Sequence, residues 1–297
     1  WRDKIGKDIN YWVKLSTGYS DNKILKANFP ATPEFDSIVE DERQDRGVWG
    51  YKCLGMFTSY QQIQEYFTQN GITSYLGKSI NDVHPGMLIY ADTHGDNDGK
   101  GNYGGPDGKV DRNDMIRLSK YSNNPYGCTL NLGGSYKDFS ISAQFSASWG
   151  SYALVNGDFR QSFNRNGYGV EYFNQPSCWS DMFVYQDIYD KEGNVTVERN
   201  INAAYPNMAY ADVNSQSSSF WLKNAAQITL RNVSIAWTMP KAWVKYVGLS
   251  NVRWNLTIQN ALYLLNPYPD KSWAPYAGAY GRYPNLRKVT LGVNVSF

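Results

Sequence analysis

A strict two-residue alternation over residues 138–150 constrains the fold of this chain more than any other feature. The segment reads DFSISAQFSASWG, and from Phe139 to Trp149 every second residue is apolar. The residues between them are all Ser or Gln. Because successive side chains of a β-strand point to opposite faces, the pattern predicts a strand with one apolar face and one neutral polar face. A wet strand face in a soluble protein usually carries Lys, Glu or Arg, and this face carries none.

Five other segments show a similar alternation and complete a predicted set of six antiparallel strands. In the segment 219–238 the phase slips, because Leu230 holds an even position whereas Val233 holds an odd one. A β-bulge near Arg231 and Asn232 would produce this slip. The predicted strands cover about 8–18, 126–136, 138–150, 219–238, 251–263 and 286–297.

Short and long links alternate between these strands. Lys137 and Asp138 can form only a tight hairpin turn, and 240–250 is a second short link. Outer-membrane barrels have short turns on the periplasmic side and long loops outside. The sequence therefore predicts an all-β, antiparallel transmembrane barrel portion whose apolar faces meet lipid and whose Ser and Gln faces meet the lumen. A half-exposed antiparallel sheet of a soluble protein is the alternative. The long, predicted external links are about 21–125, 151–218 and 263–285.

The composition is compatible with both alternatives. The 29 basic and 27 acidic residues nearly balance, so nothing requires a nucleic-acid partner. Mean hydropathy is −0.55, and no apolar run approaches the ~18 residues of a membrane helix, a test that does not detect membrane strands. Aromatic residues make up 15% of the chain, which suits sugar contact or the aromatic girdles of a membrane barrel. Three widely separated cysteines exclude a disulfide scaffold.

The carboxy-terminal residues VTLGVNVSF favour the membrane alternative. They end on an aromatic residue, Phe297, and apolar residues hold alternate positions counting back from it. This arrangement resembles the signal by which outer-membrane proteins are recognised for barrel insertion. We therefore expect Phe297 to act as an assembly signal. The buried last strand of a soluble domain would give a similar pattern.

Several longer motifs follow one another along the chain. WRDKIGKDINYWVKLSTGYSDNKIL and GVWGYKCLGMFTSYQQI come first, followed by PGMLIYADTHGD, DGKVDRND and NPYGCTLNLGGSYKDFSIS. FWLKNAAQITLRNVSIAWTMP, NVRWNLTIQNALYL and YPNLRKVTLGVNVSF complete the set. In this order they resemble the C-terminal part of the SusC/RagA family of TonB-linked outer-membrane proteins, over essentially all 297 residues.

The resemblance implies a plugged barrel of about 22 strands, of which this chain supplies about six C-terminal ones. No plug domain is recognised in residues 1–297, and the plug and the TonB-contacting segment would precede Trp1. The implied location is the outer membrane of a Gram-negative, Bacteroidetes-like cell, in contact with lipid. The implied partners are a SusD-like surface lipoprotein and TonB. The implied activity is active import of oligosaccharides or oligopeptides.

An acidic loop is the most site-like feature of the sequence. Carboxylates at this density on a flexible loop are typical ligands of calcium or another hard cation, and DGKVDRND is spaced like the second half of an EF-hand loop. A solvated loop held by Asx turns is the alternative. No cofactor is otherwise expected. The candidate metal ligands are Asp92, Asp96, Asp107, Asp111 and Asp114.

Aromatic residues within the long links are candidates for contact with cargo or with a partner. Trp179, Trp273 and Tyr276 lie deepest in these links, and packing within the loops is the alternative for each. No catalytic motif is present: GxSxG is absent, and neither of the two histidines has a partner at zinc spacing. We therefore expect a transporter rather than an enzyme. A secreted or surface-anchored β-sheet glycan-binding protein is the rival function, and an Asp/Glu glycoside hydrolase has no support beyond composition.

Overall fold

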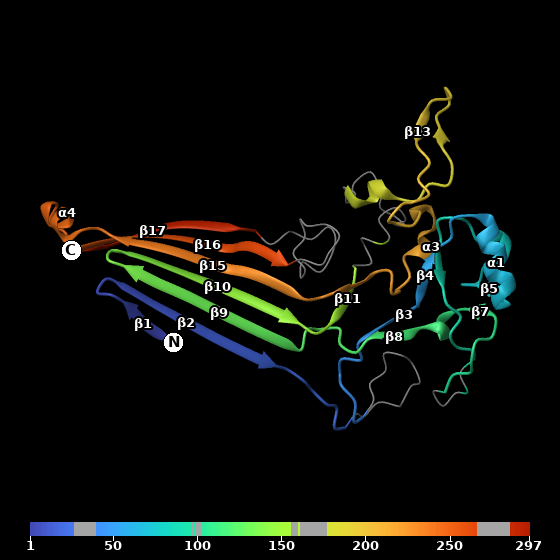
Figure 1. Ribbon diagram of the computed structural model, residues 1–297, viewed down its shortest axis with the longest axis horizontal. Helices are drawn as coiled ribbons and strands as arrows, with labels where there is room; N and C mark the ends of the chain where they lie inside the picture. The colour runs from blue at the N-terminus through green and yellow to red at the C-terminus, as the bar shows by residue number, and fades with distance from the viewer. Residues whose placement is uncertain (27–39, 97, 99–101, 156–159, 161–176, 266–285) are drawn as a thin grey trace.

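The computed structural model contains a long antiparallel sheet and a folded unit built by the links at one end of it (Figure 1). The structure describes residues 1–26, 40–96, 98, 102–155, 160, 177–265 and 286–297. Within these residues no helix is long and apolar enough to cross a membrane.

The sheet has seven strands among the described residues, in the order β1-β2-β9-β10-β15-β16-β17. All neighbours pair antiparallel. The sequence pattern did not predict β1, because four residues are too few for the alternation to register. The strands are β1 (Arg2–Ile5), β2 (Ile9–Tyr19), β9 (Tyr126–Tyr136), β10 (Phe139–Trp149), β15 (Gln227–Thr238), β16 (Asn251–Leu265) and β17 (Lys288–Ser296).

The start of β15 corrects the strand expected over 219–238. Trp221 is buried in the loop unit, and the short strand β14 (Leu222–Asn224) pairs with β11 (Tyr152–Leu154) rather than joining the sheet. The predicted bulge is confirmed. Leu230 pairs with Phe145 and Asn232 with Gln144, so the residue between them has no partner position on β10.

Short turns and long links leave opposite ends of the sheet, as Figure 1 shows. The turn between β9 and β10 consists of Lys137 and Asp138, and Lys137 takes the positive φ of 49° that two-residue hairpins of this kind need. The link between β15 and β16 contains a short helix, α4 (Lys241–Tyr246). The links that follow β2, β10 and β16 all start from the other end.

The first two long links together form a unit with its own hydrophobic core, here called the loop unit. Its larger cluster contains Phe57, Ile63, Tyr75 and Leu88 from the first link and Val213 from the second. Its remaining regular elements are β3 (Val48–Gly50), β4 (Cys53–Met56), α1 (Tyr60–Asn70), β5 (Ser74–Tyr75), β6 (Leu88–Tyr90), β7 (Lys109–Val110), β8 (Ile116–Ser119), β12 (Ile188–Tyr189), β13 (Val195–Val197) and α3 (Ala211–Asn214).

Local sequence explains how α1 begins and ends. The hydroxyl of Ser59 accepts a hydrogen bond from the Gln62 N–H, which caps the amino-terminal end of the helix. Gly71 ends the helix in the left-handed conformation, with φ 64°. Ile63 and Phe67 point into the core, one turn apart on the same side of the helix.

Candidate functional site

The polar face of the sheet is a wall of mostly neutral side chains, some of which bond to one another across strands. The amide of Asn232 donates to the Gln144 side-chain oxygen at 2.9 Å, and the amide of Gln227 donates to the Ser148 hydroxyl at 2.9 Å. Each pair lies directly opposite in the β10–β15 register. These bonds satisfy the polar groups of the wall while leaving it wettable, as a lumen surface requires.

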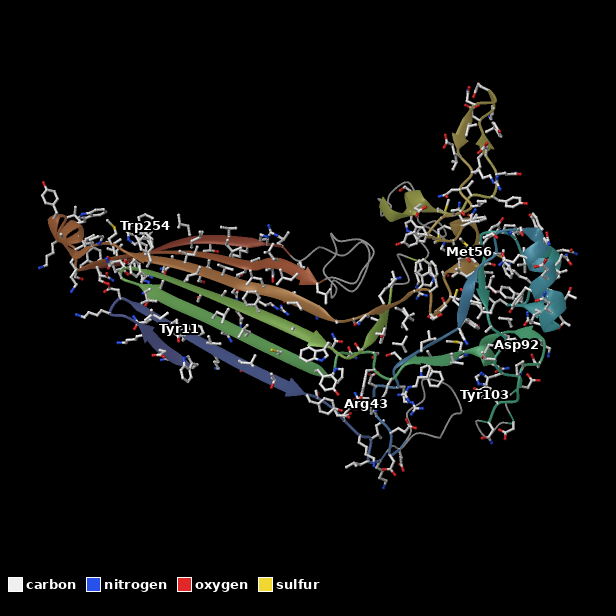
Figure 2. The ribbon with its side chains drawn as sticks, viewed as in Figure 1. Tyr11, Arg43, Met56, Asp92, Tyr103 and Trp254 are labelled. Atoms are coloured by element: carbon white, nitrogen blue, oxygen red, sulfur yellow. The ribbon has the colours of Figure 1, made fainter. Side chains whose placement is uncertain are left out.

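The opposite, apolar face is exposed over several strands. Phe139 and Ile141 are each 55% exposed, and the residues opposite them on β15 are Trp237 and Ile235, which are also apolar. Monomeric soluble proteins rarely expose a contiguous apolar surface of this extent. Figure 2 shows Trp254 near the turn end of the sheet. Exposed large residues on this face are Ile9, Leu15, Phe139, Ile141, Ile235, Trp254, Leu291 and Val293.

The polar face is electropositive. The six long strands carry four charged side chains and all are basic, because Lys14, Arg231, Arg253 and Lys288 occur without any Asp or Glu. Lys14 and Lys288 lie opposite polar-face residues of their neighbouring strands, and Arg253 donates to the Ser140 hydroxyl at 3.1 Å. A wall with one sign of charge favours the opposite sign on whatever lies against it.

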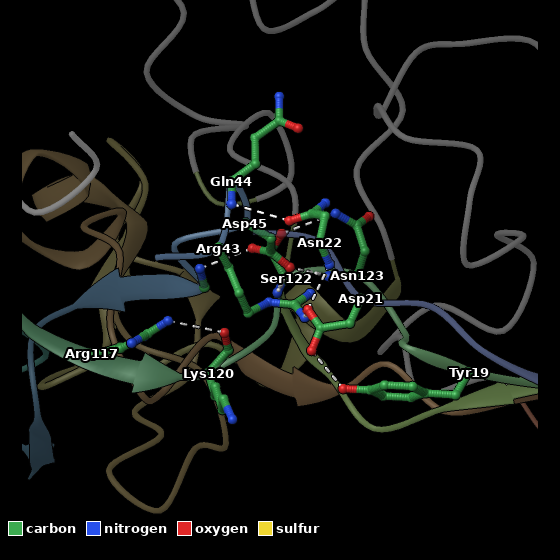
Figure 3. Close-up of polar contacts among 11 residues, drawn as sticks. Tyr19, Asp21, Asn22, Arg43, Gln44, Asp45, Arg117, Lys120, Ser122 and Asn123 are labelled. Atoms are coloured by element: carbon green, nitrogen blue, oxygen red, sulfur yellow. Dashed lines mark hydrogen bonds and ion pairs between the residues drawn. The ribbon is translucent and has the colours of Figure 1, made fainter. Parts of the chain in front are cut away.

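A polar junction joins the end of β2 to the loop unit (Figure 3). The Tyr19 hydroxyl donates to the Asp21 carboxylate at 2.7 Å, and Asp21 also pairs with the Arg43 guanidinium. The same guanidinium lies 4.4 Å from the centre of the Tyr121 ring, in cation–π contact. The junction therefore joins three separate segments of the first link next to the end of β2.

Asp45 holds the other side of this junction. Its carboxylate accepts backbone N–H bonds from Gly47 at 2.9 Å, Ser122 at 2.9 Å and Asn123 at 3.3 Å. Burial opposes ionisation of the carboxyl, but these bonds and the Ser122 side chain outweigh it and lower the pKa of Asp45.

The junction is expected to loosen in acid because of Asp45. A carboxyl whose pKa is lower in the folded protein stabilises the fold above its unfolded pKa of 3.8, and that contribution is lost as pH falls through the lower, folded value. Hydrogen exchange of residues 43–47 should therefore accelerate in that range. Asp45→Asn is the control, since it removes the titrating group. An equal acid response in both proteins would contradict the assignment.

The structure brings the acidic loop together around backbone N–H groups. Asp114 is fully buried, and its carboxylate accepts from the N–H groups of Thr93 at 2.6 Å, His94 at 3.0 Å and Asp111 at 2.8 Å. Figure 2 shows Asp92 in the same region of the loop unit. Among the residues that the structure describes, no group of three or more His, Cys, Asp or Glu side chains is placed to hold a metal ion.

The other four acidic candidates are arranged differently. The Asp107 carboxylate accepts from the Lys109 N–H at 2.9 Å. Asp92 accepts from the Gly108 N–H at 2.7 Å, and Asp111 caps a 3₁₀ turn through the Asn113 N–H at 2.8 Å. Asp96 lies beside residues outside the described range. Burial, together with the charges of Asp114 and Asp107, raises the pKa of Asp92. Hydrogen bonding thus gives the acidic pattern a structural role of its own.

Calcium binding by this loop stays a prediction that calorimetry tests directly. Calcium should release or absorb heat on binding and should protect residues 102–105 from proteolysis. The double variant Asp107→Asn with Asp111→Asn should lose both effects, since two carboxylate ligands are removed. Absence of binding heat and of protection in the unsubstituted protein would contradict the prediction.

The three predicted aromatic contacts have different positions. Trp179 is only 4% exposed, and its ring lies 5.1 Å from that of Tyr205 and 5.9 Å from that of Trp221 in the second core cluster. Its described contacts are therefore those of loop packing. Trp273 and Tyr276 lie outside the described residues.

The structure assembles a different, exposed aromatic cluster that the sequence did not indicate. The Tyr60 ring makes edge contacts with His84 at 6.2 Å and with Tyr185 at 5.6 Å, and His84 lies 5.3 Å from Tyr210. Tyr60 is 51% exposed and Tyr185 39% exposed. The members come from the first and second long links, so no local pattern could have grouped them. Exposed rings of this kind provide apolar contact area with polar edges.

Phe297 lies at the end of β17, an edge strand of the described sheet, and is 95% exposed. Deleting it should lower the amount of protein assembled in the outer membrane several-fold while changing the unfolding midpoint of assembled molecules little, because an exposed side chain leaves no cavity. Membrane fractionation and thermal unfolding of the complete protein measure the two effects. Normal yield with a lowered midpoint would contradict the assembly role, since loss of a buried Phe costs about 3–5 kcal/mol.

Known proteins resemble this chain in sequence and in fold. No family model matches the sequence. TonB-dependent receptor P3 of Formosa agariphila is 24% identical over 319 residues, a match that covers 100% of this chain and 28% of that protein. The structure of the RagAB peptide transporter has a TM-score of 0.61 at 18% identity, covering 100% of this chain and 28% of that one. The RagAB peptide importer in the closed-closed state gives 0.60 at 18%, with the same coverage.

The chain thus spans about 28% of the length of these relatives. They are a receptor and a transporter rather than enzymes, in agreement with the absence of a catalytic motif in the sequence. The chain is similar over its whole length to TonB-dependent receptors of the SusC/RagA type, which are outer-membrane proteins, and it has the fold of the matching part of their barrel.

Proposed function

We propose that this chain forms about the last quarter of the barrel of an active outer-membrane importer. The remaining strands, the plug and the TonB-contacting segment would be supplied by residues beyond this sequence. One observation carries the proposal: the sheet exposes a contiguous apolar face, bonds its polar face internally and sends its long links from one end. In lipid an open sheet edge is too costly, so β1 and β17 need further strands as partners.

Partitioning tests this proposal against the glycan-binding alternative. A barrel portion should fractionate with the outer membrane, need detergent for extraction and show heat-modifiable mobility as part of the complete protein. A soluble β-sheet lectin should dissolve in salt solution. Extraction by salt alone would contradict the barrel and favour the alternative, for which the exposed aromatic cluster would serve as a sugar platform.

The proposed cargo is an oligosaccharide or an oligopeptide, delivered with the help of a SusD-like lipoprotein over the loop unit and released by TonB. The peptide class is supported by the similar structures, which are those of a peptide transporter and a peptide importer. The oligosaccharide class is supported by the exposed aromatic cluster, since sugars stack on aromatic rings. The basic polar face favours cargo with anionic groups in either class.

Uptake by cells distinguishes the cargo classes. Cells that contain only this importer should accumulate labelled oligopeptides or labelled oligosaccharides, and the class taken up identifies the cargo. Replacing Tyr60 and Tyr185 by Ala should weaken uptake or lipoprotein binding, because both rings are exposed and contribute little to the core. The matched control replaces Tyr189, which is more exposed than either ring but lies on the β12–β13 hairpin outside the cluster. Uptake of neither class would contradict the importer.

A further inference from the structure

The link between β15 and β16 has an unusual surface. Its helix α4 exposes Trp243 by 60% and Tyr246 by 94%, and the following Val247 is 65% exposed. Lys241 and Lys245 are the only charged side chains in residues 239–250, so every charge in this segment is basic. Large rings exposed to water in this way do not stabilise the short helix that carries them.

The position of α4 is set by contacts on the apolar side of the sheet. The Trp243 ring lies 6.2 Å from that of Trp237, and Trp237 lies opposite Phe139 and Trp254 in the apolar row. Val252 belongs to the same face as Trp254, yet it is only 6% exposed because α4 packs against the start of β16. The helix therefore lies beside the apolar face at the end of the sheet opposite the loop unit (Figure 1).

We propose that α4 is an interfacial helix that docks on anionic phospholipid headgroups at the periplasmic edge of the barrel. This inference rests on the proposed membrane barrel. Trp and Tyr gather at the membrane–water interface, and Lys beside an anionic surface is attracted to it. Trp243 is in contact with Trp237, which belongs to the row of Phe139, Trp237 and Trp254. The helix would therefore extend the aromatic girdle of the barrel at the membrane surface. Lys241 and Lys245 supply the charge complementarity.

A short helix can do this because the barrel holds it in place. A free six-residue helix would neither fold nor bind a bilayer. Here the strands on either side fix its position, and Val244, 1% exposed, anchors it beneath. Docking then needs only the rings and the two ammonium groups to meet the headgroups.

Hydrogen exchange of the complete protein in nanodiscs tests the inference. Residues 241–247 should exchange about thirtyfold more slowly in discs that contain phosphatidylglycerol than in discs of phosphatidylcholine alone, since each lysine near an anionic surface contributes ~1 kcal/mol. Lys241→Gln with Lys245→Gln should abolish the difference. Trp243→Ala should raise exchange in both lipids. Lys191→Gln, on the β12–β13 hairpin of the loop unit, is the matched control and should change nothing.

The outcomes separate this inference from the function on which it rests. Normal insertion and heat-modifiable mobility, with exchange in 241–247 that is the same in both lipids, would overturn the headgroup site and leave the barrel intact. Such a result would mean that α4 is covered by the barrel itself or by a protein. Failure of the protein to insert into discs at all would overturn the barrel and this inference together.

Discussion

Replacing Phe145 by Arg should cost about 2–4 kcal/mol of stability in the membrane, whereas Gln144→Arg one residue away should be tolerated. Phe145 lies near the middle of β10 between Leu130 and Leu230 on the apolar face. Arg there would place a guanidinium in lipid. Gln144 lies on the polar face beside Asn232, where an additional cation can stay hydrated.

The pair is informative because both substitutions introduce Arg, at adjacent positions on opposite faces of β10. Reconstituted protein should be unfolded by denaturant in lipid, with heat-modifiable mobility as the readout of the folded barrel. Only Phe145→Arg should shift the midpoint strongly. Equal shifts for the two variants would mean that the faces of β10 do not differ in environment, and the barrel assignment would then be wrong.

Replacing Asn214 by Ala should destabilise the loop unit by about 3–5 kcal/mol. Asn214 is fully buried, and its side chain accepts from the Leu88 N–H at 2.8 Å. It also donates to the carbonyls of Gly86 at 2.9 Å and Asn207 at 2.7 Å. Loss of the side chain leaves the Leu88 N–H without this partner, at a cost of ~1–3 kcal/mol, and removes two further bonds of ~1 kcal/mol each.

The expected defect is local to the loop unit because Asn214 ties the first two long links to each other rather than to the sheet. Limited proteolysis of residues 48–121 should accelerate markedly while heat-modifiable mobility of the barrel stays normal. Asn224→Ala is the matched control, since Asn224 is exposed and bonds locally to the Ala226 N–H at 2.9 Å. Equal protease sensitivity of the two variants would show that Asn214 does not join the links.

The strands were predictable because their information is local. Residues 130–136 and 138–150 alternate, and β9 and β10 fall within a residue of the predicted strands 126–136 and 138–150. The slip near Arg231 is also local, and the structure has its bulge there. The start of β15 was not predictable, because Leu222 alternates as well as Ile228 does and only its pairing with β11 removes it from the sheet.

The sites were less predictable because they combine distant residues. Trp179 looked like a contact since it lies deep in a link, and only tertiary packing shows that it is buried beside Trp221. The rings of Tyr60 and Tyr185 are in contact although the two residues lie far apart in the sequence. The acidic loop looked like a cation site from its spacing. The structure shows that its carboxylates accept hydrogen bonds from backbone N–H groups. The spacing of the acidic residues does not specify these partners.

The sequence by itself determined that the chain forms strands with one apolar and one polar face, because an alternation of period two is read directly from neighbouring residues. It also determined which links are short. Only the tertiary structure decided that the first two long links fold into one unit around a common core, and that α4 lies beside the apolar face. Both depend on contacts between segments far apart in the chain, and the free energy of such contacts comes from burial and hydrogen bonds that no local pattern encodes.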